Sequence, residues 1–179
     1  TKFKLLQVIK NVQNSGKGYS VKAGFFSACG DIQVFLDADG STQPDEIERN
    51  IHYFDEGYDV VIGSRVLTGG EEQVIKTRWH RKFMGKIFNY FVRTLLFDDI
   101  WDTQCGFKMF KKEAIEPLFS RMYLRRFGFD IELLYLAHKM GYKIKEEPVS
   151  WNHIAGSKVN VIVDSIKMFF NVLQVRNWH

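Results

Sequence analysis

Two aspartates, Asp37 and Asp39, directly follow a short apolar run and precede a Gly-Ser-Thr turn. The apolar run at residues 34–36 predicts a buried strand that ends at these acids. Because side chains alternate along a strand, both carboxylates share one face if the strand continues through them. At the carboxyl end of a strand in an open α/β sheet, two hard oxygen ligands suit Mg²⁺ or Mn²⁺ holding a phosphorylated substrate. We therefore predict a metal and phosphate site here; the alternative is a solvated turn with incidental acids.

Basic residues occur at further positions where they could meet an anion. Gly16 and Lys17 stand in a polar loop before a predicted helix, whose N-terminus could cradle a phosphate together with the lysine charge. Their glycine spacing is not that of a Walker loop. Arg65 follows a predicted strand and could hold a phosphate bidentately, or be an ordinary surface arginine. A later basic cluster around Trp79 could bind an anionic headgroup or form the wet face of a helix. This cluster comprises Lys76, Arg78, His80, Arg81, Lys82 and Lys86.

Two polar segments in the second half of the chain complete the candidates. Residues 102–108, which begin at Asp102 and include Gln104, form a polar cluster that ends in glycine and enters an alternating stretch. This pattern predicts a loop that feeds a strand close to the site. Asp130 lies near the start of a predicted helix, where an aspartate commonly caps the helix or complements its dipole. From the residues alone, the capping role is favoured for Asp130.

The elements that would position these residues alternate between apolar runs and amphipathic stretches. We expect strands at residues 3–10, 31–38, 59–63 and 143–151, and another entered from the 102–106 loop. Helices are expected at residues 19–28, 44–56, 83–97, 111–120 and 127–140, and from Val159 onward. Such alternation predicts an α/β fold with a mostly parallel sheet and flanking helices. Right-handed crossovers then put Arg65 on the same sheet edge as Asp37 and Asp39.

The bulk composition limits the class of protein. A chain of 179 residues is enough for one domain with a sizeable core. A formal net charge of +4 fits an anionic partner, such as a phosphate group or a membrane surface. No apolar run approaches the roughly 18 residues that would span a bilayer. The helix at residues 159–179 has a wide apolar face that could dock on the domain or lie at a membrane interface. Nucleic acid is not an expected partner, because the acids repel phosphates unless a metal intervenes.

Five short segments, taken in order, resemble the inverting family 2 glycosyltransferases with the GT-A fold. They are Asn-Ser-Gly-Lys-Gly at 14–18, Phe-Leu-Asp-Ala-Asp-Gly at 35–40, Gly-Ser-Arg at 63–65, Asp-Thr-Gln-Cys-Gly-Phe-Lys at 102–108 and Phe-Asp-Ile-Glu-Leu-Leu at 129–134. The last two segments make the chain most similar to the dolichyl-phosphate β-glucosyltransferases. The dolichyl-phosphate mannose synthases are close relatives of these.

The resemblance implies transfer of a hexose from a nucleotide sugar to a polyprenyl or dolichyl phosphate, with inversion. Glucose from UDP-glucose is favoured, and mannose from GDP-mannose is the alternative. The enzyme would act at the cytoplasmic face of a membrane, as a peripheral protein or through segments outside this chain. The resemblance implies that Asp37 and Asp39 hold the metal, Mg²⁺ or Mn²⁺. It also implies that these two aspartates, together with Gly16 and Lys17, bind the donor nucleotide. The resemblance further implies that Arg65, with Arg78 or Arg81, binds the acceptor phosphate. Asp102 and Gln104 would lie near the donor sugar and the acceptor, and Asp130 would be the acidic residue at the reaction centre.

The chain departs from this family at its front. Members normally begin with a strand ending in a Val-Pro-x-Tyr-Asn-Glu-Glu type motif and a second strand ending in Asp-Asp-x-Ser, and neither motif is present. Those strands bind the nucleoside. We therefore expect residues 1–179 to be a single catalytic domain that is incomplete at its N-terminus and binds donor poorly by itself.

A second class of enzyme also matches the opening aspartates. Phosphohydrolases of the haloacid-dehalogenase type carry an apolar strand that ends in Asp-x-Asp-Gly-Ser/Thr. Asp37 would then be a covalent nucleophile and Asp39 an acid/base. Ser64 and the pair at residues 98–99 would supply the later motifs. This alternative leaves Arg65, the Trp79 cluster and the segment at residues 102–106 unexplained.

Overall fold

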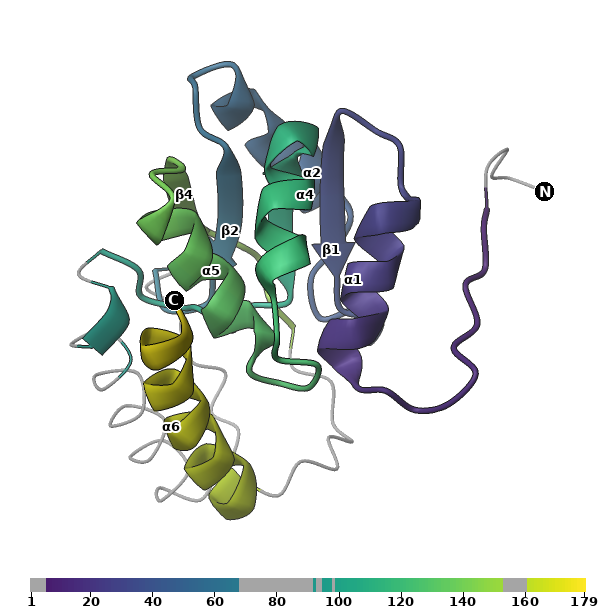
Figure 1. Cartoon of the computed structure of the whole chain (residues 1–179). Helices are drawn as coiled ribbons and strands as arrows, with labels where there is room; N and C mark the ends of the chain where they lie inside the picture. The colour runs from purple at the N-terminus through teal and green to yellow at the C-terminus, as the bar shows by residue number, and fades with distance from the viewer. Residues whose placement is uncertain (1–5, 68–91, 93–94, 98, 153–160) are drawn as a thin grey trace.

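A computed structural model describes residues 6–67, 92, 95–97, 99–152 and 161–179, with the backbone only at residues 161–166. Four strands form one sheet in the order β1-β3-β2-β4 (Figure 1). Their bounds are Ile32–Leu36 for β1, Val60–Ser64 for β2, Phe107–Lys111 for β3 and Ile144–Pro148 for β4. β3 pairs antiparallel with both β1 and β2, whereas β2 and β4 pair in parallel.

The α/β fold with flanking helices is confirmed, but the sheet is mixed rather than mostly parallel. β1, β2 and β4 run in one direction, and β3 runs the opposite way between β1 and β2. The position of the loop that precedes β3 explains the direction of this strand. The loop before it lies at the carboxyl edge, where β1 and β2 end, so β3 must run back from that edge. The periodicity of side chains along a strand carries no information on its direction.

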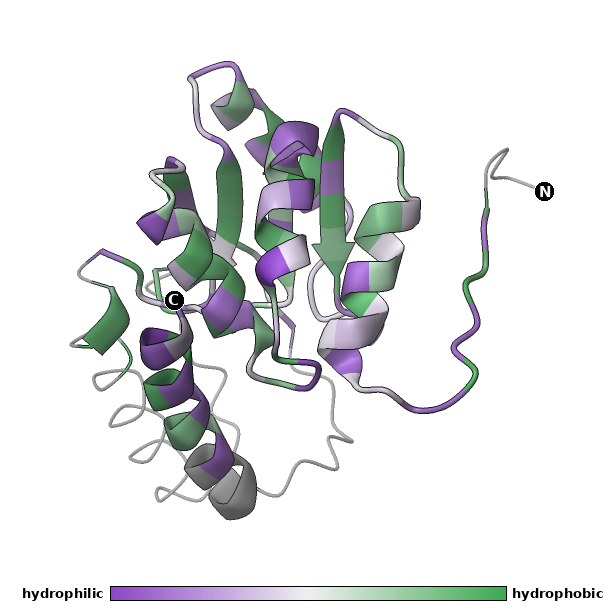
Figure 2. Cartoon of the chain, in the orientation of Figure 1, coloured by the Kyte–Doolittle hydropathy of each residue, from purple (hydrophilic) through white to green (hydrophobic). Residues whose placement is uncertain are grey.

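Helices cover both faces of the sheet, as the alternation of its side chains requires (Figure 2). Val60 and Ile62 of β2 join a core cluster with residues of α1 (Lys17–Ser27), α4 (Lys112–Arg121) and α5 (Phe129–Lys139). Val61 points the other way, into a cluster that contains Phe54 and Ile47. These two belong to the 3-10 helix η1 (Ile51–Phe54) and to α2 (Asp45–Asn50). The last helix, α6 (Val161–Trp178), contacts α5 (Figure 1).

Several expected elements are changed in the structure. The expected strand at 3–10 is wrong over residues 6–10, which have no regular structure and leave Leu6 and Val8 76% and 82% exposed. A strand forms only where a neighbour satisfies its backbone hydrogen bonds, and apolar alternation does not supply one. The expected helix at 44–56 is divided between α2 and η1. The expected helix at 83–97 lies mostly outside the described residues, although Val92 and Leu96 are helical and buried.

β4, which carries Pro148, is an edge strand of the described sheet, where a proline is tolerated. Among the helices described, none combines the length and the apolarity needed to cross a bilayer.

Candidate active site

Asp37 and Asp39 lie in a turn beyond β1, not on the strand. β1 ends at Leu36, so the condition under which strand alternation would align the two carboxylates is not met. Asp37 Oδ1 lies 2.7 Å from Lys17 Nζ, in a half-exposed ion pair. Asp39 Oδ1 accepts the backbone N–H of Ser41 at 2.9 Å. That hydrogen bond is the main reason why the pKa of Asp39 lies below its ordinary value.

Gly106 permits close contact between the 102–106 loop and Asp37. A Cβ atom at position 106 would collide with the Asp37 carboxylate, so only glycine fits there. The Asp37 backbone N–H also donates to Gly106 O at 3.0 Å. The glycine of the Asp-Thr-Gln-Cys-Gly segment therefore brings that loop against the first aspartate of the pair.

Lys17 is the first residue of α1, and the loop before α5 holds this helix start in place. Gly16, with φ +97°, packs directly on Arg125 O, and the Tyr19 N–H donates to the same carbonyl at 3.0 Å. Lys17 Nζ also lies 5.1 Å from the ring centre of Phe35. The phosphate contact expected for Gly16 and Lys17 stays a prediction, and the structure shows the lysine engaged with Asp37.

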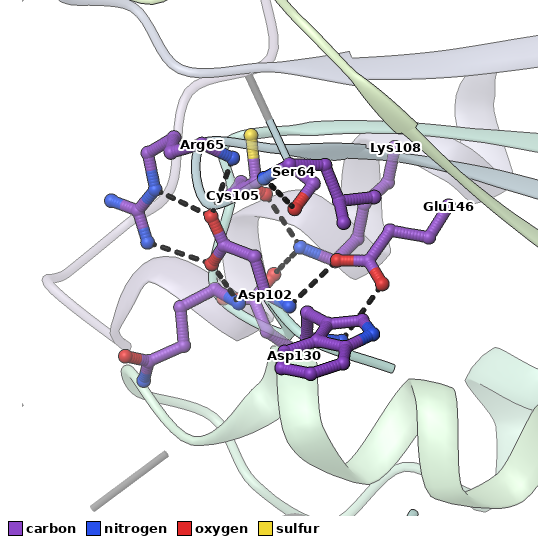
Figure 3. A network of polar contacts seen from close by, with 10 residues as sticks. Ser64, Arg65, Asp102, Cys105, Lys108, Asp130 and Glu146 are labelled. Carbon is purple, nitrogen blue, oxygen red and sulfur yellow. Dashed lines mark hydrogen bonds and ion pairs between the residues drawn. The ribbon is translucent and has the colours of Figure 1, made fainter. Parts of the chain in front are cut away.

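Arg65 and Asp102 form a bidentate pair at the end of β2 (Figure 3). Asp102 Oδ2 accepts Arg65 Nε at 2.7 Å and Oδ1 accepts Nη2 at 2.8 Å. Asp102 is 5% exposed, whereas the Arg65 side chain is 38% exposed. Burial alone would raise the pKa of Asp102, but the hydrogen bonds and charge of Arg65 outweigh it and lower the pKa. Arg65 therefore keeps its full charge beside an ionised, buried partner.

Glu146 of β4 anchors the loop that presents Asp102. Its Oε1 and Oε2 accept the backbone N–H groups of Asp102 and Trp101, both at 2.7 Å. Burial raises the pKa of the Glu146 carboxyl. Gln104 follows in the same loop, and its Nε2 lies 3.5 Å from Met168 Sδ of α6. The roles expected for Asp102 and Gln104 at donor sugar and acceptor stay predictions.

Asp130 forms a buried ion pair with Lys108, so the capping role favoured for it is wrong. The cap residue of α5 is Gly128, and Asp130 Oδ1 lies 2.7 Å from Lys108 Nζ. The two side chains are 8% and 1% exposed, and Lys108 Nζ also donates to Cys105 O at 2.6 Å. Burial raises the pKa of Asp130, while Lys108 and the more distant Lys17 oppose the rise. Asp130 thus lies in the electrostatic field of the Asp37–Lys17 pair.

Three residues of this site were missed by reading the sequence: Lys108, Glu146 and Glu132. Glu132 is fully buried in α5 and accepts the N–H groups of Tyr123 and Leu124 at 2.9 and 2.7 Å, and it lies 2.9 Å from His179 Nε2. A signal was present in two cases, since Lys108 interrupts an apolar strand and Glu132 interrupts an apolar helix face. Arg78, Arg81, the rest of the Trp79 cluster and Asp98 lie outside the described residues.

The donor atoms at Asp37 and Asp39 fit a divalent ion that shares its ligands with a substrate. Mg²⁺ is commonly held by one or two carboxylates together with substrate phosphate oxygens. Across the described part of the chain, no three His, Cys, Asp or Glu side chains gather to enclose a metal by themselves.

Comparison with known proteins gives the class of the molecule. Residues 2–119 match the glycosyl transferase family 2 domain, and the chain belongs to this family. Because the matched region contains Asp37 and Asp39, the phosphohydrolase alternative is set aside. The chain is 36% identical to dolichyl-phosphate β-glucosyltransferase of Dictyostelium discoideum, over 96% of this chain and 54% of that protein. The enzyme of the same name from Saccharomyces cerevisiae is 34% identical over 97% of this chain and 55% of its own length. The chain thus spans about half the length of the curated relatives it matches.

The fold also matches a solved enzyme at low sequence identity. Glucosyl-3-phosphoglycerate synthase from Mycobacterium tuberculosis, in complex with Mn²⁺, UDP-glucose and phosphoglyceric acid, superposes with a TM-score of 0.67 and 16% identity. The match covers 90% of this chain and 55% of that chain. The complex with uridine diphosphate gives a TM-score of 0.63 and 17% identity over the same shares. At this identity the likeness shows the fold alone.

Proposed function

We propose that this chain is the catalytic part of an inverting hexosyltransferase that moves glucose from UDP-glucose to dolichyl phosphate or another polyprenyl phosphate. The observation that carries the proposal is the composition of the carboxyl sheet edge. Asp37 and Asp39 follow β1 there, and Arg65 follows β2 on the same edge. Relatives 32–36% identical to the chain are named dolichyl-phosphate β-glucosyltransferases, which supports this acceptor and glucose over mannose.

On the donor side, Asp37 and Asp39 would hold a divalent ion, Mg²⁺ or Mn²⁺. Such an ion, when bound, stabilises the charge of the departing nucleotide diphosphate. The Mycobacterium tuberculosis synthase was solved with Mn²⁺ and UDP-glucose. This supports Mn²⁺ and UDP-glucose as the molecules that this site would bind. Lys17 lies 2.7 Å from Asp37 and keeps a cation at this turn. It would turn toward the diphosphate when that anion arrives.

On the acceptor side, the nucleophile would be a phosphate monoester. The second pKa of a phosphate monoester is about 6, so the acceptor is largely dianionic at neutral pH. Its attack therefore needs no strong general base. A phosphate oxygen would form the new bond to the anomeric carbon. The bond between that carbon and the diphosphate oxygen would break, and its electron pair would leave with the diphosphate. Arg65 would orient the acceptor by charge and by its planar donors rather than by proton transfer. Asp130, paired with Lys108, would fix local charge beside the sugar.

We further propose that the acceptor reaches the site from a membrane surface, on its cytoplasmic face, with α6 at the interface. α6 leaves Phe170, Leu173 and Trp178 58%, 38% and 46% exposed. A cavity of about 560 Å³ between α6 and the 123–128 loop is lined by both aromatic and basic side chains. Exposed aromatic residues beside basic ones are typical of contacts with anionic lipid.

The test is transfer by the purified full-length protein with UDP-glucose or GDP-mannose as donor and a polyprenyl phosphate as acceptor. We expect a β-linked glucosyl lipid, with UDP-glucose preferred. Arg65→Ala should raise KM for the lipid phosphate more than KM for UDP-glucose, while Arg121→Ala, a surface change at the end of α4, should alter neither. Preference for GDP-mannose would overturn the choice of sugar. Equal effects of Arg65→Ala on both KM values would overturn the acceptor role of Arg65.

A further inference from the structure

Glu146 lies on the edge strand β4, and its side chain also holds the loop that contains Asp102. Its two carboxylate oxygens each accept one backbone N–H, from Asp102 and from Trp101, both at 2.7 Å. When the Glu146 carboxyl is ionised, such bonds are about twice as strong as bonds between neutral groups. The segment that they hold has no helix or strand of its own. Glu146 therefore fixes a stretch of backbone that regular secondary structure does not fix (Figure 3).

The fixed backbone carries Asp102, and Asp102 in turn fixes Arg65. Asp102 receives three N–H groups of Arg65, namely the backbone N–H at 3.0 Å, Nε at 2.7 Å and Nη2 at 2.8 Å. A bidentate carboxylate sets the plane of a guanidinium as well as its position. Trp151 lies across the guanidinium, 5.8 Å from its central carbon to the ring centre. A shift of the Asp102 backbone would therefore turn the plane of Arg65.

We infer that Glu146 is a positioning residue for acceptor binding: it aligns the Arg65 guanidinium through Asp102. This inference rests on the proposed role of Arg65 toward the lipid phosphate. The chain offers a matched control in Glu147, the next residue of β4. Glu147 faces the other side of the sheet, where its Oε1 lies 2.9 Å from Lys145 Nζ.

Kinetics of five variants test the inference in the full-length protein. Glu146→Gln keeps the shape of the side chain but loses one of the two acceptor oxygens. We expect KM for polyprenyl phosphate to rise by about tenfold, as for loss of one charge-assisted hydrogen bond, with KM for UDP-glucose unchanged. Glu146→Asp should be intermediate, and it serves if Glu146→Gln does not fold. Glu147→Gln should match the wild type. Because Glu146 acts through Arg65, the double variant with Arg65→Ala should be no worse than Arg65→Ala alone.

A second readout does not depend on the reaction. The Arg65 Nε–H gives its own signal in ¹⁵N NMR spectra, and its hydrogen bond to Asp102 sets that signal. Glu146→Gln should shift or broaden it, and Glu147→Gln should leave it in place. An unchanged signal in Glu146→Gln, or additive effects of Glu146→Gln and Arg65→Ala on KM, would overturn the inference. Absence of glucosyl transfer by the wild type would overturn the proposed function instead, and the NMR signal would still decide the role of Glu146.

Discussion

Lys108 is a charged side chain in the middle of a buried strand, and its position follows from strand alternation. Phe107 and Met109 point into the cluster beneath α2 and η1, so Lys108 points to the opposite face, where α5 lies. There Asp130 meets it in the first turn of α5. Removing two charges from water is costly, and a buried pair is kept together because either ion alone would be far worse.

Breaking this pair should therefore cost more stability than deleting it. We expect Lys108→Met to lower the free energy of unfolding by about 3–5 kcal/mol, because it leaves Asp130 buried without a counter-ion. Lys108→Met combined with Asp130→Asn should recover much of that loss. Urea unfolding of the two single variants and the double variant measures the coupling. If the double variant lost the sum of the single losses, the pair would not be coupled as the structure indicates.

Asp39 has two separable properties, its charge and its turn-forming hydrogen bond to Ser41. Asp39→Asn keeps an oxygen that can accept the Ser41 N–H but removes the charge that would hold a metal. We expect it to abolish glucosyl transfer in the full-length protein while leaving the thermal unfolding midpoint nearly unchanged. Asp55→Asn, at an exposed position after η1, is the control and should keep full activity. Retained turnover of Asp39→Asn in Mg²⁺ or Mn²⁺ would remove Asp39 from the metal site.

The helix α6 has apolar side chains on more than one of its sides. Val172 and Val175 are fully buried on the domain, while Phe170 and Trp178 remain 58% and 46% exposed. At the end of the helix, His179 lies 2.9 Å from the buried Glu132 and stacks on Tyr123. One side of α6 therefore docks on the domain and another is available for a partner.

An anionic membrane is the partner that we expect for the exposed side of α6. Phe170→Ser with Trp178→Ser should weaken binding to vesicles that contain anionic lipid at least tenfold, since burying one large apolar side chain is worth about 1.5–3 kcal/mol. Co-sedimentation with vesicles measures this. Phe26→Ser on α1, which is 45% exposed, is the matched control and should bind normally. Equal loss in the control, or no loss in the double variant, would contradict an interfacial α6.

On the scale of the whole molecule, the antiparallel strand β3 assembles the site. The loop that enters β3 reaches the carboxyl edge where β1 and β2 end, and it brings Asp102 to Arg65 and Gly106 to Asp37. The 123–128 loop reaches the same region from the side of α5, through Arg125 and the start of α1. Sites composed of segments so far apart in the sequence form only when the domain is folded.

Because the site is composed of segments from the whole domain, donor binding should stabilise the domain against unfolding. We expect this stabilisation only when a divalent metal is present. We expect uridine diphosphate with Mn²⁺ to raise the unfolding midpoint of the full-length protein, with a gain of about 2.7 kcal/mol at a ligand concentration 100 times Kd. Asp37→Asn should abolish this shift. Differential scanning fluorimetry with EDTA in place of Mn²⁺ is the control. The same shift in EDTA would show that the nucleotide binds without a metal at the aspartates.

The sequence by itself determined the α/β class, most element positions and the candidate pair Asp37 and Asp39. It could do so because apolar periodicity, helix boundaries and a polar turn after an apolar run are local features of the chain. Motif order was also enough to predict the family that the comparisons then showed. The Trp79 cluster, with Arg78 and Arg81, stays a prediction because it lies outside the described residues.

Only the tertiary structure decided the direction of β3 and the partners of the charged residues. Arg65 meets Asp102, Asp130 meets Lys108, and Glu146 holds the loop that connects them. No local pattern specifies these pairs, because each joins segments at least 22 residues apart that meet through sheet order and helix packing. A side chain alone gives its charge and hydrogen-bonding capacity. Burial and the counter-ion, which decide how that charge is used, come from the fold.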